Sequence, residues 1–336
     1  MPSRLLLCVS MSLLLAAHAE AVDDPFLWLE AVEQIDVNRW VNSHNQTTAK
    51  KYTQNKNFDA LRQDLADIYD ADDRIPFASV HGKYRYNFWR DGDNPRGLLR
   101  RTSLTEYRTA DPTWEVILDL DALAKAEGEN WVYKGMTVLT RGYDRTLIRL
   151  SRGGADAVTV REFDLQEKQF VVNGFVVDEA KTRISWLDHE TVLVGTHTGP
   201  GALTASGYPR QLREWRRGTR LSDAPIVFSG QTSDVSVSAF TDLEPNHEVV
   251  MAVRARTFYE ADYFVRNDDQ WLQLALPNQV QLTIHRGQLF VSPKEPWRKA
   301  GTVFPAGSLI RLDLRDFLAG VGSAELIYTP KPGKSL

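Results

Sequence analysis

The chain has 336 residues, of which 43% are hydrophobic, 10% aromatic and 25% charged, a profile typical of folded proteins and not of disordered, collagen-like or membrane-spanning ones. Its 40 Lys and Arg against 44 Asp and Glu give a formal charge of −4, which is too small and of the wrong sign to indicate a nucleic-acid or anionic-membrane partner. The only cysteine, Cys8, lies in a segment that we expect to be removed, so we expect no disulfide and no cysteine metal site in the mature chain.

The N-terminus has the three regions of a secretory signal peptide. Arg4 and the amino group are positive, and Leu5 to Ala17 form a mostly apolar run that is too short to span a bilayer. Small residues then precede Ala21 at the spacing that a signal peptidase requires. We expect a signal peptide over residues 1–21 with cleavage after Ala21, and a periplasmic or secreted protein with no membrane anchor. The alternative is a buried N-terminal helix.

Residues 22–72 are predicted to be mainly helical. No Gly or Pro occurs between Ile35 and Asp70. Apolar residues recur there at steps of three and four, as on one face of a helix, at Phe58, Leu61, Leu65 and Ile68. Two helices of about a dozen residues each fit this segment. Helices that short have little of their own to pack against, so their apolar stripe requires a partner surface.

After residue 72 the sequence consists of short β-branched and aromatic runs separated by turn residues. Tyr84, Tyr86 and Phe88 alternate with polar residues, as in a half-buried strand, and similar runs continue without a long helical pattern between them. Many short, evenly spaced strands indicate a sandwich, a barrel or a propeller. Residues 73–336 fit about five propeller blades of about 50 residues each. A generic large β domain is the alternative, because no WD or kelch motif recurs.

The sequence contains no recognisable set of catalytic residues. It lacks the Gly-x-Ser-x-Gly turn of an α/β-hydrolase, and His189-Glu190 lacks the second histidine of a metalloprotease helix. His189 and His197 could meet across a hairpin and bind a metal, although turn histidines without a metal are much commoner. We therefore predict no catalytic residue, no metal and no cofactor, and leave the substrate-binding residues unassigned.

Two groups of charged residues are weaker candidates. The carboxylates at predicted turns are Asp188, Glu190, Asp268 and Asp269. A pair about 5 to 9 Å apart could hydrolyse glycosides, but carboxylates also collect at turns for local hydrogen bonding. The densest basic stretch surrounds Trp215 with Arg213, Arg216, Arg217 and Arg220. In an acidic chain this stretch favours a solvated strand face or a clamp for an acidic neighbour over a nucleic-acid site.

Three stretches of the mature chain form a recognisable set. They are Asp24-Pro25-Phe26-Leu27-Trp28-Leu29-Glu30, the run from Ser151-Arg152-Gly153-Gly154-Ala155-Asp156 to Arg161-Glu162-Phe163-Asp164, and Ser206-Gly207-Tyr208-Pro209-Arg210 with the following Trp215 and Arg217. In this order they resemble the prolyl oligopeptidase family of serine peptidases. The resemblance covers essentially all of the mature chain.

This resemblance implies a seven-bladed β-propeller that caps an α/β-hydrolase domain, with the N-terminal helical segment belonging structurally to the hydrolase. It therefore supplies the partner surface that the helices of residues 22–72 require. We expect a mainly β fold, in which a short α-helical segment precedes an incomplete, truncated propeller of about five of the seven blades over residues 73–336. The family's catalytic Ser, Asp and His belong to the hydrolase, and no residue of this chain matches them.

Several functions remain open at this point. The first is the propeller portion of an exported prolyl oligopeptidase-like peptidase, which by resemblance cleaves short peptides after proline. The propeller would then restrict access to a hydrolase supplied by another domain or chain, and we expect this chain to be inactive alone. The alternative is a non-catalytic periplasmic propeller that binds peptides or acts as a scaffold. A carbohydrate-active propeller is a third possibility, and it predicts two carboxylates converging on the central channel.

Overall fold

The computed structural model describes residues 24–334 and divides the chain into two units, Met1–Tyr69 and Asp70–Leu336. The predicted signal peptide of residues 1–21, with Cys8 and the cleavage site at Ala21, lies outside the described residues. Within residues 24–334, no helix is both long and apolar enough to cross a membrane. The prediction of a mainly β fold with five propeller blades after a short helical segment is confirmed.

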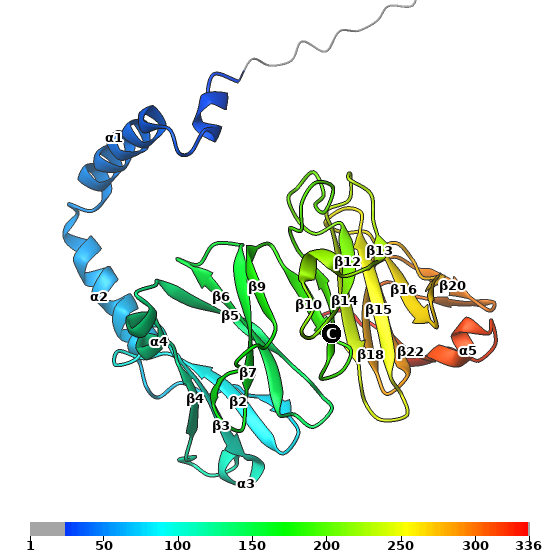
Figure 1. The fold of residues 1–336 in the computed structure, drawn as a ribbon. Coiled ribbons are helices and arrows are strands. Elements are labelled where there is room, and N and C mark those ends of the chain that lie inside the picture. Colours follow the sequence, from blue (N-terminus) through cyan, green and yellow to red (C-terminus); the bar gives the residue numbers. More distant parts are fainter. Residues whose placement is uncertain (1–23, 335–336) are drawn as a thin grey trace, which may run out of the picture. The chain divides into compact units, whose positions relative to one another are not determined.

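The first unit is helical (Figure 1). It contains a single 3-10 turn and two α-helices, which are η1 (Leu27–Glu30), α1 (Ile35–Tyr52) and α2 (Lys56–Asp70). The helices have 18 and 15 residues, longer than the sequence pattern predicted, because nothing in either segment breaks a helix. Asp36 in the first turn of α1 and the lysines in its last turn complement the helix dipole.

Aromatic residues hold η1 against α1, whereas α2 leaves its apolar stripe uncovered. The rings of Phe26 and Trp28 each lie 6.2 Å from that of Trp40. The stripe predicted on α2 is present on the surface, with exposed fractions from 37% to 64%, at Phe58, Leu61, Leu65 and Ile68. No residue of α2 is buried. The helical unit therefore has little core of its own.

Among the described residues, the second unit contains five antiparallel sheets of four or five strands, each built from one stretch of the chain, and a separate two-stranded hairpin. We name the five sheets blades 1 to 5. Blade 1 contains β1 (Ser79–His81), β2 (Tyr84–Trp89), β3 (Leu98–Ser103) and β4 (Glu115–Asp119). Blade 2 contains β5 (Trp131–Val138), β6 (Arg145–Arg152), β7 (Val158–Asp164) and β8 (Gln169–Phe170), with β9 (Val176–Ala180) also paired to β7.

The remaining three blades repeat this plan. Blade 3 contains β10 (Arg183–Trp186), β11 (Thr191–Gly195), β12 (Gln211–Arg216) and β13 (Ile226–Ser229). Blade 4 contains β14 (Ser236–Asp242), β15 (Val249–Ala255), β16 (Ala261–Asn267) and β17 (Gln270–Gln273). Blade 5 contains β18 (Val280–His285), β19 (Gln288–Pro293), β22 (Leu309–Asp313) and β23 (Glu325–Tyr328).

Short elements join these strands. They are the helices α3 (Leu104–Tyr107), α4 (Leu120–Glu127), η2 (Leu221–Asp223) and α5 (Leu314–Leu318), and the hairpin of β20 (Trp297–Lys299) and β21 (Thr302–Phe304). Asp119 caps α4 by accepting a hydrogen bond from the backbone N–H of Ala122 at 2.9 Å, and Gly128 ends it in a left-handed conformation.

The first strands of blades 2, 3 and 4 lie side by side in chain order. Trp186 of β10 donates its indole N–H to the carbonyl oxygen of Thr137 in β5, at 2.9 Å. Ser185 of β10 donates its hydroxyl to the carbonyl oxygen of Ala239 in β14, at 2.8 Å. Figure 1 shows β10 beside β14 in this arrangement. Sheets whose first strands pack in sequence form a propeller.

Antiparallel pairing gives the propeller two distinct ends. The turns between first and second strands and between third and fourth strands lie at one end, which we name the turn face. The connections between second and third strands, and the chain leading into each first strand, lie at the other end, which we name the connection face. Residues 70–78 therefore enter blade 1 at the connection face.

The core of the propeller lies between adjacent blades. One cluster joins blades 1 and 2 through buried side chains, including Tyr86, Leu99, Trp131, Ile148 and Phe163. Phe175, Trp186 and Trp215 pack edge to face between blades 2 and 3, with ring centroids 5.0 and 5.8 Å apart. Each fully buried side chain of this size stabilises the fold by about 1.5–3 kcal/mol. Alternate residues of the strands supply these side chains, which is why alternation in the sequence identified the strands.

Candidate functional site

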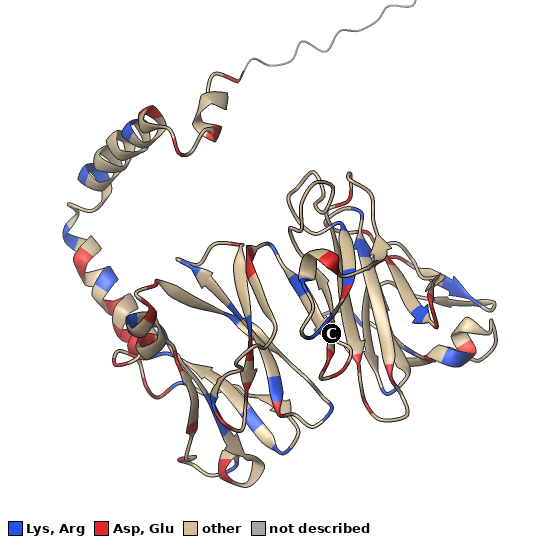
Figure 2. Cartoon of the chain, in the orientation of Figure 1, with Lys and Arg blue, Asp and Glu red and all other residues tan. Residues whose placement is uncertain are grey.

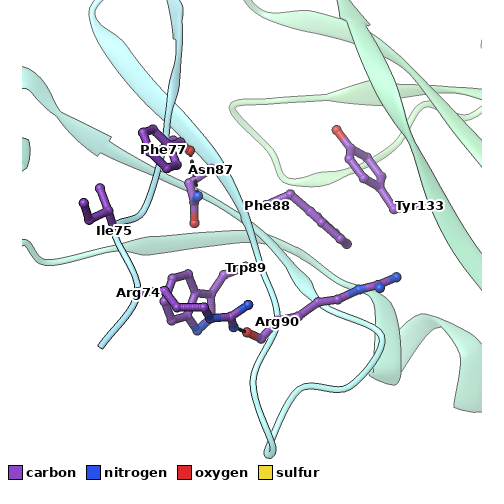
Figure 3. A pocket seen from close by; sticks show the side chains of 8 residues that line it. All are labelled: Arg74, Ile75, Phe77, Asn87, Phe88, Trp89, Arg90 and Tyr133. Carbon is purple, nitrogen blue, oxygen red and sulfur yellow. Dashed lines mark hydrogen bonds between the residues drawn. The ribbon is translucent and has the colours of Figure 1, made fainter. Parts of the chain in front are cut away.

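A cavity of about 760 Å³ opens on the connection face of blade 1. It is lined by the chain leading into β1, by the end of β2 and by one residue of β5 (Figure 3). Phe77 and Ile75 in the entering chain are 80% and 71% exposed. Large apolar side chains this exposed beside a cavity are typical of a surface that binds something.

Hydrogen bonds fix the walls of this cavity. Asn87 of β2 donates its side-chain N–H to the carbonyl oxygen of Phe77 at 2.8 Å, which holds the entering chain against the strand. Arg74 donates to the carbonyl oxygen of Arg90, and Figure 3 shows both bonds. The indole N–H of Trp89 donates to a carboxylate oxygen of Asp91 at 2.7 Å. The residues that line the cavity are thus held in place by their own neighbours.

Aromatic side chains from two blades form one wall. The rings of Phe88 in β2 and Tyr133 in β5 stack with centroids 4.4 Å apart and planes 20° apart. Burial raises the pKa of Tyr133, so its phenol stays protonated at neutral pH. Stacked rings add about 0.5–1.5 kcal/mol beyond the area that they bury. This wall joins blade 1 to blade 2.

The cavity is basic. The guanidinium of Arg74 lies 4.9 Å from the ring centre of Trp89, and that of Arg100 lies 4.2 Å from it. Burial lowers the pKa of Arg100 to about 10, which still leaves it charged at neutral pH. Among residues 24–334, no carboxylate lies within 4.0 Å of a side-chain nitrogen of Arg74, Arg90 or Arg100. Cations beside aromatic rings suit a ligand with carboxylate or carbonyl oxygens.

Two of the recognised sequence stretches also meet on the connection face. They lie at the second-to-third connections of blades 2 and 3. The phenol of Tyr208 donates to a carboxylate oxygen of Asp156 at 3.2 Å, which joins the two connections. Arg152 at the end of β6 forms ion pairs with Glu129 and Glu179. The cavity and these connections make the connection face the candidate functional surface.

His189 and His197 do not come together. His189 lies in the turn before β11 and His197 lies after that strand, so the five residues of Thr191–Gly195 separate them. A strand rises about 3.3 Å per residue, so the hypothesis of a metal site across a hairpin is wrong. His189 instead places its Nε2 3.0 Å from a carboxylate oxygen of Asp144. Within residues 24–334, no group of three or more His, Cys, Asp or Glu is placed to bind a metal.

The candidate carboxylates serve turns and the blade interface. Asp188 accepts a hydrogen bond from the backbone N–H of Glu190 at 2.7 Å. Asp268 and Asp269 form the turn between β16 and β17, where Asp268 has a positive φ of 53°. Glu190 lies 3.3 Å from a side-chain nitrogen of Arg217. These local roles give no support to a glycosidase.

One arginine of the basic stretch forms an ion pair between two blades. Arg217 of blade 3 donates two hydrogen bonds to Glu162 of blade 2, at 2.7 and 3.0 Å. These bonds raise the pKa of Arg217 further above its usual value. Arg213 donates to the hydroxyl of Thr198 at 3.1 Å and to the carbonyl oxygen of Ala224 at 2.5 Å, within its own blade. Lys and Arg are interspersed with Asp and Glu along the ribbon (Figure 2), so charge does not indicate a nucleic-acid surface.

Ion pairs at two other blade interfaces place their cation and carboxylate in the same order. Arg266 of blade 4 donates to Glu214 of blade 3 at 2.6 Å. Lys168 of blade 2 lies 2.9 Å from a carboxylate oxygen of Glu115 in blade 1. At each of these interfaces the later blade supplies the cation and the earlier blade the carboxylate. Arg141 of blade 2 also pairs with Glu248 of blade 4, with the cation on the earlier blade, so ion pairs join both adjacent and non-adjacent blades.

Reasoning from sequence did not identify the cavity. Trp89 and Arg90 end an alternating strand and precede the turn Asp91-Gly92, and an aromatic and a cation at a strand end are a weak sign of a binding surface. Tyr133 is 45 residues further along the chain than Phe88, and only the packing of blade 1 on blade 2 brings the two together.

The chain matches a known protein family and two curated relatives. A family model described as "Prolyl oligopeptidase, N-terminal beta-propeller domain" matches residues 14–316. The chain is 35% identical over 324 residues to an uncharacterized peptidase of Sinorhizobium fredii, covering 93% of this chain and 45% of that protein. It is 26% identical to an uncharacterized peptidase of Rickettsia prowazekii, covering 90% and 44%. The chain thus spans less than half the length of the curated relatives it matches.

Solved structures give the same result. A post-proline cleaving enzyme from Rickettsia typhi aligns with a TM-score of 0.82 and 27% identity, covering 90% of this chain and 47% of that one. Oligopeptidase B from Leishmania major aligns with a TM-score of 0.61 at 14% identity, covering 92% and 49%. The second likeness shows the fold alone. In both alignments about half of the solved chain has no counterpart here.

Proposed function

Because the chain belongs to the prolyl oligopeptidase family, with the N-terminal β-propeller domain of that family over residues 14–316, we propose that it is the propeller portion of a serine peptidase that cleaves short peptides after proline. The likeness to the Rickettsia typhi post-proline cleaving enzyme carries this proposal. The catalytic Ser, His and Asp, with an oxyanion hole, then belong to an α/β-hydrolase domain supplied by the complete protein or by another chain.

The helical unit has its own part in this proposal. The exposed stripe of α2 is apolar along one side, and the helices have almost no buried residues of their own. We assign the helical segment of residues 22–72 to the surface of the hydrolase domain, where the stripe becomes buried. Burial gains about 25 cal/mol for each Å² of apolar surface removed from water.

The propeller would control access to the hydrolase. Residues 70–78 join the helical unit to the connection face of blade 1, where the cavity opens. A hydrolase that packs on the helical unit is tethered to the propeller at that end. The stacked rings of Phe88 and Tyr133 and the guanidinium of Arg74 can then contact a peptide on its way to the active site. A short extended peptide fits such a surface, whereas a folded protein does not.

We further propose export. The N-terminal sequence of a positive residue, an apolar run and small residues before Ala21 supports removal of residues 1–21 and a periplasmic or secreted location. Mass spectrometry of the protein recovered from the periplasm or the medium tests this proposal. The expected mature chain begins at Val22, and a protein that retains Met1 would contradict it.

A hydrolysis assay tests the proposal that peptide cleavage requires the hydrolase domain and not this chain alone. Purified residues 22–336 are incubated with a chromogenic peptide that has proline at the cleaved position, beside a matched peptide with alanine there. We expect no release of the chromophore from either peptide by this chain. Turnover of the proline peptide that a serine-directed inhibitor abolishes would refute the proposal.

The cavity also favours a second candidate, a peptide-binding or scaffold propeller that functions without a hydrolase. Trp89 lies at the wall of the cavity, so its fluorescence should report a bound peptide. Two results together would favour this candidate. The purified chain would be monodisperse, unfold cooperatively and bind a proline-rich peptide at micromolar concentration. The source cells would encode no matching hydrolase portion. Aggregation of the chain without its hydrolase portion would favour the first.

A further inference from the structure

The cavity of Figure 3 adjoins two further cavities along blade 1. A second cavity of about 470 Å³ shares Phe77, Phe88 and Tyr133 with it. A third, of about 560 Å³, shares His81 with the second and reaches the turn face at Lys83. Because neighbouring cavities have lining residues in common, we treat them as one groove, which we name the blade 1 groove. It runs from the connection face to the turn face.

The walls of the blade 1 groove are aromatic and apolar. Phe77, Ser79 and His81 alternate along the chain, so they present one side of β1 to the groove. Phe88 faces it from β2, and Met136 faces it from β5. The six residues of β2 span about 20 Å at about 3.3 Å each, which is the length of about six extended peptide residues. The groove therefore has the dimensions of an extended peptide.

Charge distinguishes this groove from the rest of the chain. Of the described residues, no Asp or Glu lines any of the three cavities, whereas four cations do, namely Arg74, Arg90, Lys83 and Arg101. Arg74 and Arg90 lie at the connection face, and Lys83 and Arg101 lie at the turn face. Arg101 is paired with Glu115, but within residues 24–334 no carboxylate lies within 4.0 Å of the charged nitrogens of the other three. Arg101 is also buried, so the cations free to meet a ligand are Arg74 and Arg90 at one end and Lys83 at the other.

We propose that the blade 1 groove binds an extended peptide with an apolar, proline-containing centre and a carboxylate toward each end. The aromatic middle of the groove would cover the centre of the peptide, while Arg74 and Arg90 at one end and Lys83 at the other would pair with its carboxylates. Phe77, now 80% exposed, would become buried against the ligand. The inference deepens the proposed function, on which it rests for the choice of a peptide as ligand.

Calorimetry with two peptides tests the charge preference. The probe is a capped hexapeptide with aspartate at each end and Ala-Pro-Phe-Ala between, and the reference peptide has lysine at each end. We expect the aspartate peptide to bind residues 22–336 with a dissociation constant on the order of 10 μM, at least about tenfold more tightly than the lysine peptide. Raising the salt concentration should weaken it, since exposed charges are screened. Equal binding of both peptides would overturn the inference.

Matched substitutions locate the binding. Phe77→Ala, Lys83→Ala and Arg90→Ala change exposed side chains that line the groove, so the fold should persist. We expect each to weaken binding of the aspartate peptide by about three- to tenfold. Their controls are Phe258→Ala, which removes a side chain 90% exposed, and Arg298→Ala on exposed β20. If the controls weaken binding as much as the groove variants, the ligand binds elsewhere and the inference is wrong.

The test of peptide binding in the groove and the test of the proposed peptidase function can fail independently. Calorimetry with residues 22–336 requires no hydrolysis, so absent binding overturns the groove and leaves the proposed function standing. Hydrolysis by this chain alone would refute the proposed function without affecting the measured affinities. The two failures are therefore distinguishable.

Discussion

Arg217 of blade 3 and Glu162 of blade 2 form a bidentate ion pair, in which the Glu162 side chain is fully buried and the Arg217 side chain is 23% exposed. Glu162 also accepts a hydrogen bond from the backbone N–H of Phe175 at 2.9 Å. A buried carboxylate without its cation is strongly unfavourable. The pair is therefore expected to decide how firmly these two blades hold together.

We expect Arg217→Ala to lower the free energy of unfolding by about 1–3 kcal/mol, because it removes two hydrogen bonds to the buried Glu162 carboxylate and leaves Arg145, 3.6 Å away, as the remaining cation. The double variant with Glu162→Gln should recover part of that loss, because it removes the buried charge that only Arg145 would otherwise pair. Urea unfolding followed by tryptophan fluorescence gives both values. Arg152→Ala serves as the control, since its ion pairs are half exposed and should contribute little to stability. A cost for Arg217→Ala no larger than this control would contradict the account.

His81 should make the propeller less stable in acid. Burial lowers the pKa of His81 below its ordinary value of 6.5, so the unfolded chain binds its proton more readily than the folded chain does. Stability should accordingly fall as pH drops below about 6.5 and down to the lowered pKa of the folded state. His81→Gln removes the titration, so its stability between pH 7 and 5 should fall less than that of the unaltered chain. Parallel curves for the two proteins would show that His81 has no such role.

The stacked wall of the groove should depend on the ring of Tyr133 and not on its hydroxyl. Tyr133→Phe keeps the stack on Phe88 and should change the melting temperature little. Tyr133→Ala removes the ring and should cost about 2–4 kcal/mol, through lost burial and a cavity between blades 1 and 2. Calorimetric melting of the two variants tests this expectation. Equal losses in both would assign the contribution to the phenol.

Gly97 should tolerate no side chain. Its φ is +105°, and a Cβ there would lie 2.5 Å from the ring of Phe88 and 2.9 Å from the carbonyl oxygen of Trp89. Gly128 also has a positive φ, of +66°, but a Cβ there would meet nothing within 4 Å. Gly128→Ala should therefore cost about 1 kcal/mol for its backbone alone, and Gly97→Ala clearly more. Similar unfolding midpoints for the two variants would contradict the close packing at Gly97.

The strands could be predicted because their signal is local. Tyr84, Tyr86 and Phe88 alternate within six residues, and they form β2 as expected. The stripe of α2 repeats within one helix and is equally legible. The number of blades follows from the length of the β region and the size of one blade. Periodicity and length were therefore sufficient for the fold class.

The functional surface could not be predicted from the sequence, because contacts between residues that are distant in the chain form it. The stack of Phe88 on Tyr133 and the pair of Arg217 with Glu162 join residues 45 and 55 positions apart, and no local pattern reports either. The less favoured possibility that His189 and His197 meet is excluded because the five residues of β11 lie between them along one strand. The number of residues between two side chains does not give the distance between them unless the structure of the intervening segment is known.

Reaction with a fluorophosphonate, which forms an adduct with an activated serine, tests the central claim most directly. Residues 22–336 are incubated with the reagent and weighed by intact-mass spectrometry, beside a prolyl oligopeptidase that contains its hydrolase domain. The account predicts a stoichiometric adduct on that enzyme and none on this chain, because this chain supplies the propeller and not the nucleophile. A stoichiometric adduct on one serine of this chain, prevented by a proline-containing peptide, would contradict it.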